Sequence, residues 1–83
     1  MTLEKISKPN YTLDNARLVR IAEVEENRYA AHVRFPRDEA FISEAKDCVR
    51  SYLHLQNIRH KIEEAKYSNP YTICVIFTTS KTI

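Results

Sequence analysis

The sequence predicts a small α+β domain, a β-β-α(α)-β sandwich in which one long or kinked helix covers one face of a three-stranded sheet. Three features support this class. Apolar residues alternate at 29–35, a helical apolar period follows, and a run at 71–80 is apolar on both parities. The chain has 83 residues, enough for one domain with a modest core. We expect an N-terminal arm at 1–15 and a single α+β domain at 16–83.

The arm is polar and has no clear period, and Tyr11 and Leu13 can attach it to the domain. The first expected strand covers 16–25, but its apolar residues fall on both parities, so the sequence leaves its facing open. The second strand covers 29–35 and joins the first as a β-hairpin. Pro36 ends it, because proline cannot donate a backbone hydrogen bond to a sheet.

The helical period starts at Asp38, the expected N-cap, and runs to about Tyr67. Two apolar stripes share this period. The first is Phe41, Ala45, Cys48, Tyr52 and Leu55, and the second is Ile58, Ile62 and Ala65. The stripes lie about 90° apart around a helix axis, so a straight helix cannot bury both against one flat sheet. We therefore expect a kink or break at 54–57, where Asn57 can cap a new segment. The alternative is a continuous helix that contacts two surfaces, one of them a second protein chain.

The strongest expected strand is YTICVIFTTS, residues 71–80, which follows the helix-stopping Pro70. A strand that is apolar on both parities is normally buried on both faces. In a three-stranded sheet this strand lies at an edge or beside one hairpin strand, and an apolar edge promotes aggregation. We therefore expect it to pair with the arm, with a partner protein, or with a second copy in a homodimer. The expected partner interface consists of Ile58, Ile62, Ala65, Cys74 and Ile76.

The composition excludes several kinds of site. The chain has no glycine, which rules out glycine-rich phosphate loops and leaves tight turns to Asn, Asp or Pro. Its net charge of +2 is too small to indicate nucleic-acid or membrane binding by the whole molecule. No apolar run is long enough to span a bilayer, and the N-terminus lacks the apolar core of a signal peptide, so we expect a cytoplasmic protein.

The sequence nominates no catalytic or metal site, no cofactor and no small-molecule substrate. His54 and His60 are too far out of phase to share a helix face, and the paired-cysteine spacing typical of zinc sites is absent. Cys48 and Cys74 both lie in apolar stretches, which favours packing over nucleophilic chemistry. Two pairs of adjacent glutamates could in principle act as acid and base. Glu25 and Glu26 fit a turn better, and Glu63 and Glu64 fit a solvated helix face better.

Basic side chains share the polar parity of the strand at 29–35. Arg20 joins the same face if Val19 and Ile21 face the core. The candidate anion-binding or nucleic-acid-binding residues are Arg20, Arg28, His32, Arg34 and Arg37 around the hairpin, and Lys46 and Arg50 on the helix. A cationic sheet face can hold phosphates, although no aromatic residue shares this parity and solvated faces of small domains are often basic.

From these features we expect a small non-enzymatic protein-binding module of inhibitor or adaptor type, acting through an apolar strand edge or helix face and a basic surface. A small protein that binds DNA or RNA through its basic sheet face is the alternative. A small enzyme of unknown class is a second alternative, and it is disfavoured because no nucleophile, base and oxyanion site occur together in the sequence.

Overall fold

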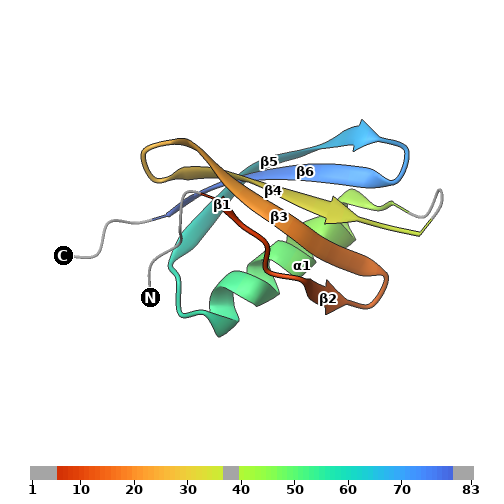
Figure 1. The fold of residues 1–83 in the computed structure, drawn as a ribbon, viewed down its shortest axis with the longest axis horizontal. Coiled ribbons are helices and arrows are strands. Elements are labelled where there is room, and N and C mark those ends of the chain that lie inside the picture. Colours follow the sequence, from red (N-terminus) through yellow and green to blue (C-terminus); the bar gives the residue numbers. More distant parts are fainter. Residues whose placement is uncertain (1–5, 37–39, 80–83) are drawn as a thin grey trace.

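The computed structural model describes residues 6–36 and 40–79. These residues form a two-layer molecule, and Figure 1 shows its single helix lying along one side of a twisted sheet. In chain order the elements are β1 (Ile6–Ser7), β2 (Tyr11–Leu13), β3 (Ala16–Glu25), β4 (Arg28–Arg34), α1 (Ile42–Leu55), β5 (His60–Asn69) and β6 (Thr72–Thr79). In the described ranges, no helix combines the length and apolarity that crossing a membrane requires.

The strands form one antiparallel sheet in the order β1-β3-β4-β6-β5, and β2 pairs with another part of β3. The predicted three-stranded sheet is therefore wrong, although the chain does mix a sheet with a helix. The strand expected at an edge or beside one hairpin strand does lie beside the hairpin strand β4, but it is not an edge strand, because β6 is also paired with β5 along its other side. Both edges of this apolar strand are therefore paired within the chain, and it needs no strand from another molecule. The expected hairpin of β3 and β4 is present.

The predicted helix is wrong beyond Leu55, because the residues after the break form β5 rather than a second helical segment. The ladder between β5 and β6 shifts register twice, between Ile62 and Glu64 and between Tyr67 and Asn69. An extra residue at such a bulge interrupts the strict alternation of a strand. Ile62 and Ala65 therefore both pack against the core, three positions apart, and this spacing resembles that of a helix.

The break predicted at 54–57 is present, and the backbone there closes the end of α1. The Ile58 N–H donates to the Leu53 carbonyl at 2.9 Å, and the Asn57 N–H donates to the His54 carbonyl at 3.0 Å. These two bonds form the Schellman arrangement, which places its C′ residue in the left-handed region. Asn57 occupies that position with φ of 58°. It therefore ends a helix rather than beginning one.

The start of α1 follows Phe41, whose backbone is extended and whose side chain makes no capping hydrogen bond. The predicted N-cap Asp38 lies outside the described residues. The helix buries Ala45, Cys48, Val49 and Leu53. The predicted stripe is therefore rotated, because Phe41 is 56% exposed and Leu55 is 64% exposed.

The core lies between α1 and the sheet. Its largest fully buried side chains are Phe77, Leu18, Ile21, Leu53, Ile73, Val33, Val49, Val75 and Cys48. The register of β3 shifts between Leu18 and Arg20, so Leu18 and Ile21 are both fully buried although they have opposite parity. This irregularity explains why the sequence left the facing of β3 open. Tyr11 and Leu13 pack against the same core and attach β2 to it, as expected.

Candidate binding surface

The sheet face turned away from α1, which we call the open face, collects polar side chains from four neighbouring strands. Cross-strand partners lie on the same face of a sheet. Arg20, His32, Cys74 and Lys66 are successive partners across β3, β4, β6 and β5. We call these four residues the Arg20 row. Neighbouring strands are about 4.8 Å apart, so the row spans about 14 Å of backbone.

A second basic pair, Arg17 and Arg34, lies next to the Arg20 row. The two residues are cross-strand partners on β3 and β4. The guanidinium carbon of Arg34 lies 5.8 Å from the centre of the Tyr71 ring, which is within the range of a cation–π contact. Arg17 donates to the Asn10 side-chain oxygen from Nε at 3.2 Å and from Nη2 at 2.9 Å. The pair therefore has neutral partners.

The basic charges of this region are not balanced within the described part of the chain. No described carboxylate lies within 4.0 Å of a side-chain nitrogen of Arg20, Arg34 or Lys66. All three side chains are exposed. We call Arg17, Arg34 and the Arg20 row together the cationic end of the open face. It can attract an anionic ligand without first breaking an ion pair between Arg20, Arg34 or Lys66 and a described carboxylate.

The opposite end of the open face is electrostatically mixed. Arg28 is paired there with Glu25 at 3.3 Å and with Glu63 at 3.0 Å. Between the two ends lies a short apolar row, in which Ala22, Ala30 and Ile76 are cross-strand partners. Ile76 is half-buried, so part of its side chain is available for contact. The open face therefore changes from cationic to apolar to mixed along its strands.

His32 and Cys74 occupy the middle of the Arg20 row and are both half-buried. Burial lowers the pKa of His32, and the charge of Arg20 lowers this pKa further. Burial raises the pKa of the Cys74 thiol; Lys66 opposes this rise and Glu64 adds to it. At neutral pH the histidine is therefore mainly neutral and the thiol protonated, which makes Cys74 a poor nucleophile.

The structure brings four of the predicted basic residues together and separates two others from them. Arg20, Arg28, His32 and Arg34 all lie on the open face. Lys46 and Arg50 belong to α1, in the other layer, where Arg50 is paired with Asp47 at 3.0 Å. Arg37 lies outside the described residues.

The predicted partner-interface residues do not form one surface. Ile58, Ile62 and Ala65 are half-buried and pack against the core on the helix side of the sheet. Cys74 and Ile76 are half-buried on the open face. The expected second helical stripe is therefore mostly used for internal packing.

Sequence reasoning missed Lys66 and Tyr71 as parts of this surface. Lys66 was assigned to a helix, so its position opposite Cys74 was not expected. Tyr71 is 40% exposed and precedes β6, whereas the sequence predicts it as the first residue of an apolar strand. Its position next to the turn that contains Pro70 was the available signal, because a residue beside a turn is freer to face solvent.

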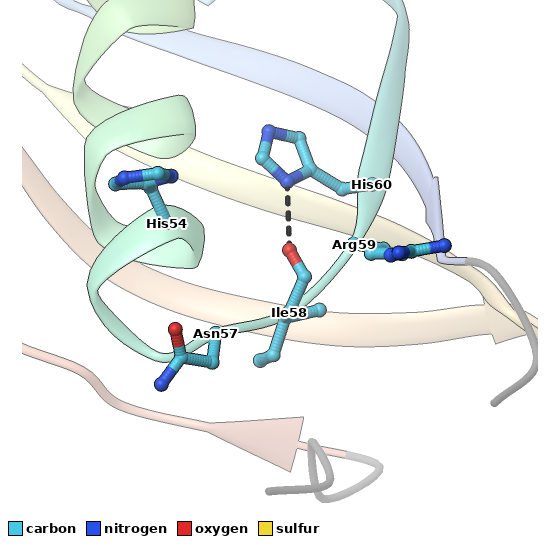
Figure 2. A pocket seen from close by; sticks show the side chains of 5 residues that line it. All are labelled: His54, Asn57, Ile58, Arg59 and His60. Atoms are coloured by element: carbon cyan, nitrogen blue, oxygen red, sulfur yellow. Dashed lines mark hydrogen bonds between the residues drawn. The ribbon is translucent and has the colours of Figure 1, made fainter.

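A shallow hollow of about 540 Å³ lies at the end of α1, lined by His54, Asn57, Ile58, Arg59 and His60. Figure 2 shows that the polar side chains of this hollow do not converge, since Arg59 extends away from the two imidazole rings. His60 Nδ1 lies 3.0 Å from the Ile58 carbonyl oxygen and donates to it, so one ring nitrogen is already used. The described part of the chain holds no group of three or more His, Cys, Asp or Glu side chains placed to bind a metal.

No family model, curated protein or solved structure matches the chain.

Proposed function

We propose that the chain is a small non-enzymatic protein-binding module of inhibitor or adaptor type, which docks on an acidic surface of a partner protein through the cationic end of its open face. One observation carries the proposal: Arg20, Arg34 and Lys66 gather on a helix-free sheet face with no described carboxylate within 4.0 Å of them. Unbalanced charge of one sign steers the approach of an oppositely charged partner and disfavours partners of the same charge.

The neighbouring side chains favour a protein over a bare polyanion. Protein interfaces combine an apolar centre with a polar rim, and they are enriched in Arg and Tyr. The half-buried Ile76 lies one row away from the Arg20 row and offers such an apolar contact. Tyr71 under Arg34 supplies a rigid aromatic side chain at the other border of the cationic end.

The first experiment reverses charge on the open face and uses poly-L-glutamate as the acidic probe. We expect Arg20→Glu/Arg34→Glu to weaken binding at least about tenfold, which corresponds to about 1.4 kcal/mol. The matched control is Lys46→Glu/Arg50→Glu, which makes the same change of net charge on α1 and should bind within about twofold of the wild type. Fluorescence anisotropy of labelled poly-L-glutamate at low salt measures both. Equal losses in the two variants would show that the open face is not the site.

A second function is favoured by the cation–π contact of Arg34 with Tyr71, because stacked aromatic rings beside cations also bind single-stranded nucleic acid. Under this alternative a labelled oligonucleotide binds with a steep salt dependence, since binding releases counterions. The same two double variants discriminate the functions. Oligonucleotide binding that Arg20→Glu/Arg34→Glu abolishes, together with no binding of poly-L-glutamate, would replace the first proposal by the second.

A further inference from the structure

His32 is the one histidine of the described residues that lies among the unbalanced charges of the open face. Its cross-strand partners are Arg20 on β3 and Cys74 on β6, and Lys66 follows on β5. The imidazole therefore lies between the two permanent cations of the Arg20 row. A segment that carries carboxylates to both Arg20 and Lys66 must pass over His32.

We infer that His32 couples the docking of this acidic partner to the uptake of a proton, so that the open face binds carboxylate-bearing segments more tightly as the pH falls from about 8 to about 6. The inference rests on the function proposed above and adds a regulation of the same site.

The charges around His32 in the free protein oppose its protonation. Arg20 faces it from β3, and Arg34, whose own cross-strand partner is Arg17, is the next open-face residue along β4. From the other side come the Cys74 thiol on β6, and the Lys66 ammonium and Glu64 carboxylate on β5. The basic groups outnumber the one acidic group. Both burial and the charge of Arg20 keep the pKa of the free imidazole below its ordinary value.

A docked carboxylate reverses this balance. It neutralises part of the field of Arg20 and can accept a charge-assisted hydrogen bond from the imidazolium, which is stronger than one from neutral imidazole. The pKa of His32 is therefore higher in the complex than in the free protein. By linkage, the affinity rises as the pH falls through the pKa of the complex and levels off below the pKa of the free protein.

The remaining histidines provide an internal control. His54 belongs to α1 and His60 begins β5, and both line the shallow hollow at the end of α1 rather than the Arg20 row (Figure 2). Partner carboxylates over the Arg20 row do not reach them. We therefore expect substitutions of these two histidines to leave the pH dependence of binding at the open face unchanged.

The experiment measures binding of poly-L-glutamate at about pH 6 and about pH 8 at constant ionic strength, where the probe stays ionised. We expect the wild type to bind about fivefold more tightly at the lower pH. His32→Gln should remove most of this difference, and His54→Gln/His60→Gln should retain it. In the wild type, the His32 imidazole signal in NMR should titrate at a higher pH when poly-L-glutamate is present.

Each outcome supports or overturns the inference. Retention of the full pH effect by His32→Gln would overturn it, and so would a His32 titration midpoint that saturating poly-L-glutamate leaves unchanged. Wild-type binding that is equal at both pH values overturns the inference and leaves the proposed function standing. Absence of binding at both pH values overturns the proposed function, and the inference fails with it.

Discussion

At the scale of single residues, the lack of glycine decides how the chain turns. The left-handed backbone region is costly for most L-residues, and Asn and Asp tolerate it best after glycine. Four described residues have positive φ: Asn10, Asp14, Asn27 and Asn57. Each lies in a connection between two elements. The expectation from composition that turns use Asn, Asp or Pro is thereby confirmed at these positions.

Asn57 provides a test of this argument at one position. Asn57→Ala should lower the free energy of unfolding by about 1 kcal/mol, because the Cβ of alanine clashes at φ of 58° without the local hydrogen bonds that an asparagine side chain can form. Asn57→Gly should be neutral or stabilising by up to about 1 kcal/mol. Urea unfolding monitored by circular dichroism measures both. Equal stability of the two variants would contradict the role assigned to the left-handed backbone.

At the scale of elements, the sequence correctly predicts strands whose apolar residues follow a two-residue period. It fails for β5, where bulges interrupt that period. The strand predicted at 29–35 from its alternating apolar residues is found at Arg28–Arg34. The run at 71–80 is found as a strand at Thr72–Thr79. By contrast, β5 combines good helix formers with an apolar spacing of three. This segment is a strand because it pairs with β6 in a ladder that contains two bulges. A short stretch of sequence does not reveal that pairing.

β5 is also an exposed edge strand, since β6 is its only partner among the described strands. Edge charges and bulges oppose pairing with another chain, and β5 has both. Lys61→Val/Glu64→Val keeps the net charge and should cause concentration-dependent association by light scattering. The control, Lys46→Val/Asp47→Val on α1, also keeps the net charge and should scatter like the wild type. Wild-type behaviour in both variants would show that these charges do not protect the edge.

At the scale of the whole molecule, the candidate surface depends on contacts between distant parts of the chain. Arg20 and His32 could be placed on one face from the sequence, because they belong to one hairpin with a short turn. Cys74 and Lys66 join them only through the pairings of β6 with β4 and of β5 with β6. Such non-local pairings follow from how the core closes over the whole sheet. The sequence therefore indicates half of the Arg20 row and misses the rest.

Among the described residues, the open face carries a net positive charge. Arg17, Arg20, Arg28, Arg34, Lys61 and Lys66 lie there together with Glu25, Glu63 and Glu64, for a formal charge of +3, whereas the whole chain carries +2. Two copies that meet through this face therefore repel each other, but an acidic partner is attracted. Salt screens both the repulsion between two copies and the attraction of an acidic partner. Added salt therefore favours self-association through this face and weakens binding of the acidic partner.

The opposite salt dependence of the two interactions distinguishes a homodimer formed through the open face from binding of an acidic partner to that face. Between about 20 mM and about 500 mM NaCl, binding of poly-L-glutamate should weaken at least about tenfold, because each contact loses Coulomb attraction. Over the same range, any self-association through the open face should strengthen, because the mutual repulsion of the two cationic ends is screened. Sedimentation velocity measures self-association, and Arg20→Glu/Arg34→Glu serves as the control, since it reverses the sign of the charge on the face. A wild-type dimer that forms at low salt and dissociates at high salt would contradict this expectation, because attraction between unlike charges would then hold the two copies together.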